Sequence, residues 1–239
     1  MRRAYLYGDL LFETILASGG KIPHILRHYK RLAHGAEVLK FDLCGLNEEK
    51  FVEVLENELS VFLLKNSHSK AQRMRFVLYR NAEGLYLPQN NNTQYEVEIA
   101  DFEISHEHKP VKGAVYQEQQ KAPGPLSNLK SGNALIYVMA KIWAQDNELE
   151  DALITNTSQE IIEASSSNIF WQKNNHWFTP PLSSGCIAGI GRELFMEQEE
   201  VQEKKCMYSE LLQADKIILT NALVPQRPFL LAEKQFIKE

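Results

Sequence analysis

Cysteine is scarce in this chain, and its spacing excludes two kinds of stabilised domain. Only three cysteines occur in 239 residues, at positions 44, 186 and 206, and no Cys-x-x-Cys pair is present. An odd, widely spaced set indicates neither a disulfide framework nor a zinc knuckle. We therefore expect a protein of a reducing compartment, the cytoplasm.

Runs of one charge and long hydrophobic runs are also missing. The net charge is −5 and no basic cluster occurs, so nothing indicates a nucleic-acid partner. The N-terminus begins with Met1, Arg2 and Arg3, but no long apolar core follows. We expect no signal peptide and no membrane span.

Several catalytic signatures are absent as well. No Gly-x-Ser-x-Gly elbow surrounds the serines at 165–167, which disfavours a serine hydrolase. His24 and His28 have helical spacing, and His106 and His108 lie in a polar stretch, but the sequence places no acidic or cysteine partner beside them. We expect no metal site.

The first half of the chain has the pattern of a small α/β domain. Residues 10–17 and 73–80 alternate as strands, and residues 95–104 resemble a neighbouring strand. Apolar residues at helical spacing follow Pro23, and a second helix is expected from an N-cap at Asn47 to residue 65. This pattern predicts a first domain over residues 1–120.

The second half is richer in strands. The Pro- and Gly-containing residues 121–125 are the best linker candidate. The elements expected after it are a helix over 134–147, strands at 152–155, 160–163, 168–171, 176–179 and 216–221, and a helix over 190–205. The residues expected on the buried side of the first helix are Leu135, Ile136, Met139, Ile142 and Trp143. This order predicts an α+β protein whose larger second domain, residues 126–239, contains a barrel-like sheet.

Four features could carry chemistry, although each taken alone has an ordinary alternative. A lysine against apolar walls loses solvation of its charged form and becomes a nucleophilic amine, which Lys130 could be, but most lysines are solvated. A carboxylate such as Glu163 can keep a pyridine nitrogen protonated, but a solvent-facing strand glutamate is the commoner case. The glycines around Ile190 precede a helix whose N-terminus suits a phosphate, and Arg31 could bind one too.

The order of these residues resembles the fold-type IV pyridoxal phosphate enzymes. That family comprises branched-chain aminotransferases, D-amino acid aminotransferases and 4-amino-4-deoxychorismate lyases. The segments that resemble its motifs are residues 8–14 (GDLLFET), 28–32 (HYKRL), 129–133 (LKSGN), 163–170 (EASSSNIF), 179–181 (TPP) and 189–192 (GIGR). The resemblance covers nearly the whole chain and implies the fold of D-amino acid aminotransferase, with a small N-terminal domain and a larger barrel-like one.

The resemblance also implies roles for single residues. Lys130 would form the Schiff base with pyridoxal 5′-phosphate, and Glu163 would face the ring nitrogen. Arg31, Ile190 and Gly191 would lie at the phosphate. Gly191 stands where the family usually has threonine, so backbone N–H groups would have to suffice there, with help from Asn221. Gln159 replaces an expected glycine before the glutamate strand.

Within the family, the lyases are the most similar. Residues 220–225 (TNALVP) resemble the lyases' Asn-Ala-Leu-Met-Pro segment, where branched-chain enzymes have Gly-Thr-Ala. The resemblance thus implies conversion of 4-amino-4-deoxychorismate to 4-aminobenzoate and pyruvate, with Arg75 as a candidate carboxylate contact and a homodimeric assembly. An aminotransferase for branched-chain or D-amino acids stays open, as does a non-catalytic relative that binds the cofactor or a partner.

Overall fold

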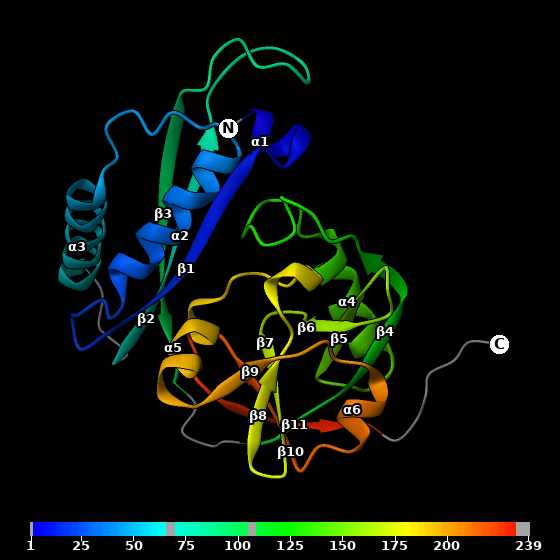
Figure 1. Ribbon diagram of the computed structural model, residues 1–239. Coiled ribbons are helices and arrows are strands. Elements are labelled where there is room, and N and C mark those ends of the chain that lie inside the picture. Colours follow the sequence, from blue (N-terminus) through cyan, green and yellow to red (C-terminus); the bar gives the residue numbers. More distant parts are fainter. Residues whose placement is uncertain (1, 66–69, 105–108, 233–239) are drawn as a thin grey trace. The chain divides into compact units, whose positions relative to one another are not determined.

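The computed structural model describes residues 2–65, 70–104 and 109–232, which form two compact units (Figure 1). The first unit comprises residues 2–104 together with the short segment 129–133. The second comprises residues 109–128 and 134–232. This division differs from the expected boundary, because residues 121–125 lie within the second unit and Lys130 belongs to the first.

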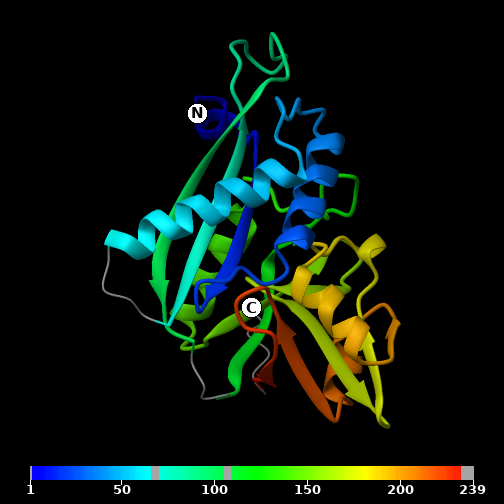
Figure 2. The ribbon, with the colours of Figure 1, turned by 90° about the vertical axis from the view of Figure 1, so that its left-hand side faces the viewer.

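The first unit is a three-stranded antiparallel sheet covered by helices. The strands are β1 (Leu10–Ser18), β2 (Ala71–Arg80) and β3 (Thr93–Phe102), in the order β1-β2-β3, and a short helix, α1 (Arg2–Tyr7), precedes β1. Every second residue of β1 from Leu11 to Ala17 is buried, as expected for a strand with one covered face. The helices α2 (Ile25–Val38) and α3 (Glu48–Lys65) lie across this sheet (Figure 2).

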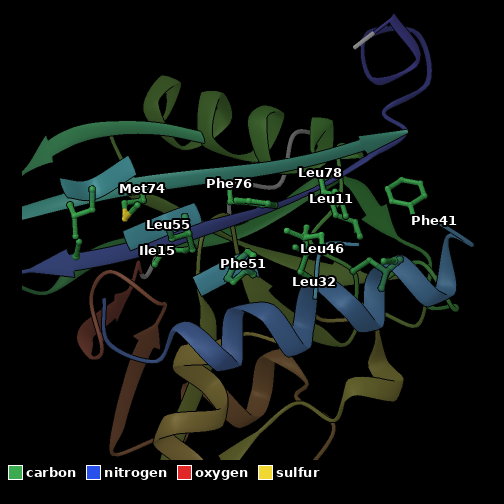
Figure 3. Close-up of a cluster of buried hydrophobic side chains, with 14 residues drawn as sticks. Leu11, Ile15, Leu32, Phe41, Leu46, Phe51, Leu55, Met74, Phe76 and Leu78 are labelled. Atoms are coloured by element: carbon green, nitrogen blue, oxygen red, sulfur yellow. The ribbon is translucent and has the colours of Figure 1, made fainter. Parts of the chain in front are cut away.

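The core of this unit lies between the sheet and the two helices. Leu11 and Ile15 of β1, Leu32 of α2 and Phe51 of α3 are buried together with Phe76 of β2 (Figure 3). The helix α3 begins as its sequence predicts: the Asn47 side chain accepts a hydrogen bond from the Lys50 N–H at 2.8 Å.

The second unit contains an eight-stranded sheet that closes on itself. Its order is β10-β11-β4-β5-β6-β7-β8-β9, and β10 also pairs with β7, so the strands from β10 through β7 form a six-stranded barrel. The strands are β4 (Val111–Lys121), β5 (Asp151–Asn156), β6 (Ile161–Ala164), β7 (Asn168–Lys173), β8 (His176–Thr179), β9 (Val201–Glu203), β10 (Lys216–Thr220) and β11 (Arg227–Leu231). The predicted α+β fold with a barrel-like second domain is confirmed.

The helix α4 (Leu135–Asp146) packs on the barrel through a different face from the expected one. Ile136, Ala140, Trp143 and Ala144 are buried. The prediction of an inward position was wrong for Leu135, Met139 and Ile142, which are 77%, 43% and 45% exposed. The prediction favoured large apolar side chains for the buried face. Instead, the small side chains of Ala140 and Ala144 let the helix approach β4 and β5 closely.

Another helix is shorter than expected. The helix α5 covers Ile190–Gln198, whereas the sequence predicted a helix to residue 205. Glu199 has extended backbone angles, and β9 then pairs in parallel with β8. Pairing with an available strand thus overrode local helix propensity. The remaining short elements are η1 (Leu182–Ser184) and α6 (Tyr208–Leu212). Among the described residues, every helix is too short or too polar to cross a bilayer.

Candidate active-site residues

Lys130 is half-buried and lies beside β1, next to Ser131, which forms an isolated bridge with Leu11. The Phe12 N–H donates to the Lys130 carbonyl at 2.9 Å, and the Gly132 N–H donates to the Leu10 carbonyl at 3.1 Å. Leu129, the preceding residue, is buried in the core of the first unit. A Cβ at Gly132 would lie 2.8 Å from the Gly8 carbonyl oxygen, so only glycine permits this close approach.

The ring of Phe12 brings Lys130 and Arg75 together. The Lys130 Nζ lies 4.3 Å from the ring centroid, and the Arg75 Cζ lies 4.7 Å from it. Both distances are typical of cations held on an aromatic face. Two of the residues predicted for cofactor and substrate therefore share one aromatic neighbour, which the sequence analysis did not identify.

Arg31 is engaged by a buried carboxylate. Its Nε donates to the Glu13 Oε1 at 2.8 Å, its Nη2 donates to Oε2, and the His28 Nδ1 lies 2.6 Å from the same Oε2. Burial would raise the pKa of Glu13, but Arg31 and His28 lower it to about 2. Arg31 and Lys130 thus contact consecutive residues of β1, Glu13 and Phe12.

Glu163 lies in the interior of the barrel sheet. It stands on β6 between Ile154 of β5 and Asn168 of β7, and it is 2% exposed. Its Oε2 accepts a hydrogen bond from the Ile187 N–H at 2.8 Å. The ordinary alternative of a solvent-facing glutamate is therefore excluded, and a buried carboxylate needs a reason for its charge.

Two further residues hold this carboxylate, and no sequence motif indicated either of them. The Lys121 Nζ and the Tyr137 hydroxyl donate to the Glu163 Oε1, at 2.7 and 2.8 Å. Lys121 was assigned to a linker because Pro123, Gly124 and Pro125 follow it. The strand β4 that carries it has a polar end with no alternation, so no sequence pattern indicated its direction.

The first turn of α5 is built tightly around its glycines. A Cβ at Gly189 would lie 1.9 Å from the Asn168 Oδ1, and one at Gly191 would lie 2.7 Å from the Asn221 carbonyl oxygen. Ile190, the first helical residue, is buried between them. The N–H groups of a first helical turn lack intrahelical acceptors, so this turn presents backbone donors to an anion.

The backbone of Asn221 lies against the first turn of α5. Its Oδ1 accepts hydrogen bonds from the Leu223 and Val224 N–H groups, at 2.9 and 2.8 Å, and its Nδ2 donates to the Ser167 hydroxyl at 3.1 Å. The side chain therefore shapes the turn after β10. Its backbone occupies the space that Gly191 leaves open, so the glycine that departs from the family pattern has a packing reason.

The histidines give no cluster of metal ligands. His28 contacts Glu13, and His24 precedes α2 with a positive φ of 59°. His106 and His108 lie outside the described residues. Within residues 2–65, 70–104 and 109–232, no group of three or more histidine, cysteine or acidic side chains could hold a metal ion.

A family model described as amino-transferase class IV matches residues 10–230. The chain belongs to this family of pyridoxal phosphate-dependent enzymes. Each of the groups described above suits this cofactor by its chemistry: a half-buried lysine beside β1, a buried carboxylate, and a helix start lined by glycine. The chain is thus a pyridoxal phosphate-dependent enzyme, a lyase or an aminotransferase.

The curated relatives of this chain are named for three different activities. An aminodeoxychorismate lyase of Vibrio harveyi is 25% identical over 95% of this chain and 84% of that protein. A putative branched-chain-amino-acid aminotransferase of Methanocaldococcus jannaschii is 28% identical over 90% and 75%. A D-alanine aminotransferase of Staphylococcus haemolyticus is 25% identical over 95% and 80%.

Solved structures share the fold. A putative 4-amino-4-deoxychorismate lyase of Legionella pneumophila superposes with a TM-score of 0.89 at 24% identity, covering 99% of this chain and 87% of that one. A hypothetical aminotransferase of Mycobacterium tuberculosis in its pyridoxal phosphate-bound form gives a TM-score of 0.82 at 16% identity, covering 99% and 86%.

Proposed function

We propose that this enzyme is a lyase that converts 4-amino-4-deoxychorismate to 4-aminobenzoate and pyruvate. In this proposal Lys130 would be the amine to which the cofactor aldehyde attaches, and Glu163 would accept a hydrogen bond from the protonated ring nitrogen. Ile190 and Gly191 offer backbone N–H groups to the phosphate, Asn221 supports that turn, and Arg31 adds positive charge.

The bound cofactor would withdraw electrons from the substrate carbon that bears the amine. Lys130 would be the base that takes the proton from that carbon. Its position on Phe12 supports this role, because an aromatic face orients the amino group. Arg75, on the same ring, is the proposed contact for a substrate carboxylate.

The turn at Asn221 is the observation that carries the lyase assignment. The sequence of this turn resembles the lyases' segment, and its geometry is coupled to Gly191, since the Asn221 backbone fills the place of a Gly191 side chain. Glycine at position 191 and the lyase-like turn at Asn221 therefore depend on each other for space. A class IV aminotransferase is the second candidate, because curated relatives of similar identity have that activity.

Substrate assays separate the two candidates. With purified holoenzyme and aminodeoxychorismate, we expect pyruvate, detected with lactate dehydrogenase, and 4-aminobenzoate, detected by fluorescence, without any added 2-oxo acid. Turnover that occurs only when an amino acid and a 2-oxo acid are supplied together would contradict the lyase proposal and support an aminotransferase.

The lysine assignment has its own test. Borohydride reduction of the holoenzyme should fix the cofactor to the peptide that contains Lys130, as shown by mass spectrometry. The Lys130→Ala variant should lose this covalent adduct and, because the proposed base is gone, more than about 10²-fold in rate. A matched Lys141→Ala variant, at an exposed position of α4, should keep the adduct. An adduct that persists in Lys130→Ala would show that another lysine holds the cofactor.

We further propose a homodimer in the cytoplasm that serves folate-precursor synthesis. The three cysteines are unpaired thiols, and Cys186 and Cys206 are buried, which agrees with a reducing compartment. Light scattering after size exclusion should give about twice the chain mass of 27.4 kDa. A mass equal to that of one chain would contradict the dimer.

A further inference from the structure

Glu163 has a pair of partners that reaches it from two different elements. Lys121 ends β4 and Tyr137 lies in the first turn of α4, while Glu163 lies on β6. The Lys121 Nζ lies 2.7 Å from the Glu163 Oε1 and 2.6 Å from the Tyr137 oxygen, and the Tyr137 oxygen lies 2.8 Å from Oε1. The three polar groups therefore form a closed triangle.

The two oxygens of Glu163 are used unequally. A carboxylate oxygen has about two acceptor positions. Both positions of Oε1 are used, by Lys121 and Tyr137, whereas Oε2 accepts only the Ile187 N–H among donors of the described residues. One position of Oε2 therefore stays open for a further N–H group.

The charge of Glu163 is balanced before any ligand arrives. The Lys121 side chain is 13% exposed and the Glu163 side chain is 3% exposed, so water screens this ion pair poorly. Burial and the charge of Glu163 both raise the pKa of Tyr137, which therefore stays a neutral phenol that can donate.

A further titratable group beside Glu163, the thiol of Cys186, is also neutral. Cys186 lies in the segment that precedes α5. Burial raises the pKa of its thiol to about 12, and the negative charge of Glu163 adds to this effect. Arg192 also acts on this thiol, but its guanidinium is paired with Glu203. Among the described residues, Lys121 is thus the cation in direct contact with Glu163.

We propose that Lys121 and Tyr137 are positioning residues that fix Glu163 with Oε2 toward the ring nitrogen of the cofactor and lower the proton affinity of that nitrogen. The inference rests on the proposed role of Glu163. An ammonium on Oε1 withdraws part of the negative charge that would otherwise stabilise a protonated ring. Tyr137 fixes the position of the Lys121 ammonium relative to the Glu163 carboxylate, because its hydroxyl contacts both groups.

The test reads the ring nitrogen itself. Holoenzyme is loaded with pyridoxal phosphate labelled with ¹⁵N in the ring, and the ¹⁵N chemical shift is followed against pH. In Lys121→Met the ring nitrogen should keep its proton to a pH about 1 to 3 units higher than in the wild type, because the carboxylate recovers its full charge. Tyr137→Phe should shift the titration in the same direction by less.

Three variants make the result specific. Lys121→Arg keeps the charge and should restore the wild-type titration, which a purely structural role would not require. Lys141→Met removes a lysine of α4 that donates to the Glu150 carbonyl, and it should change nothing. Glu163→Gln should lower the pH at which the ring nitrogen loses its proton.

The outcomes distinguish this inference from the function on which it rests. If Glu163→Gln shifts the titration and neither Lys121→Met nor Tyr137→Phe does, the positioning role is wrong and the role of Glu163 stands. If Glu163→Gln has no effect, the role of Glu163 fails and the inference fails with it. Tighter cofactor binding by Lys121→Met with an unchanged titration would also overturn the inference, because Lys121 would then leave Glu163 when the cofactor enters.

Discussion

Single residues show how a departure from the family pattern can have a packing cause. Gly191 has no room for a side chain, since a Cβ there would lie 2.7 to 2.8 Å from three backbone atoms of Asn221. Side chains can rotate away from a clash, but backbone atoms can move only with their whole turn. A threonine at 191 would therefore displace the Asn221 turn, and glycine with this turn forms a matched pair.

A Gly191→Ala variant tests this coupling. Alanine favours a helix by about 1 kcal/mol over glycine, but overpacking costs about 1 to 3 kcal/mol, so we expect a net loss in the free energy of unfolding. Cofactor affinity should fall as well. Gly124→Ala is the control, because its Cβ would meet nothing within 4 Å. Urea titrations and cofactor titrations measure both effects, and equal stabilities of the two variants would contradict the clash.

Residue patterns indicated candidate site residues but not the partners of Glu163. Lys130, Glu163 and Gly191 could be singled out because their motifs are local in sequence. Lys121 and Tyr137 could not, because they reach Glu163 from positions 42 and 26 residues away. No local pattern encodes such a contact.

At the scale of elements, local signals predicted where helices begin better than where they end. Asn47 was expected to start a helix, and its side chain does cap α3. The end of α5 was misjudged by several residues, because pairing of Val201–Glu203 with β8 ends the helix. A cap is made by neighbours in sequence, whereas a pairing partner is supplied by the fold.

The cap of α3 gives a quantitative prediction. Asn47→Ala removes the acceptor of the Lys50 N–H and should lower the free energy of unfolding by about 1 kcal/mol. Asn57→Ala lies in the exposed middle of the same helix, where alanine is the better helix former, and should not lower it. Urea titrations followed by circular dichroism compare the two, and an equal loss in both variants would exclude a capping effect.

At the scale of the whole molecule, the buried cluster of Glu13, His28 and Arg31 should govern acid stability. Burial lowers the pKa of His28 despite the bond to Glu13, and the pKa of Glu13 is about 2. Both groups bind protons more readily when the chain is unfolded. Stability should therefore be full at neutral pH and fall as the pH drops below about 6.5, where unfolded His28 charges, and further between about 4.5 and 2 through Glu13.

This pH dependence can be assigned to one residue. His28→Asn should flatten the stability profile between about pH 7 and pH 5, because asparagine does not titrate there. His34→Asn, at an exposed position of the same helix, should leave the slope unchanged. Urea midpoints measured across this range give the slopes, and an unaltered slope in His28→Asn would show that another group binds the protons.

The amino-acid sequence by itself determined the alternation of β1 and β2, the start of α3, the α+β order of elements and the motifs around Lys130, Glu163 and Gly191. These depend on neighbours within a few residues, where periodicity and turn chemistry act. Only the tertiary structure decided the closure of the barrel, the buried face of α4, the end of α5 and the ion pair of Lys121 with Glu163. Each of these depends on surfaces supplied by distant segments, whose burial and pairing outweigh local preference.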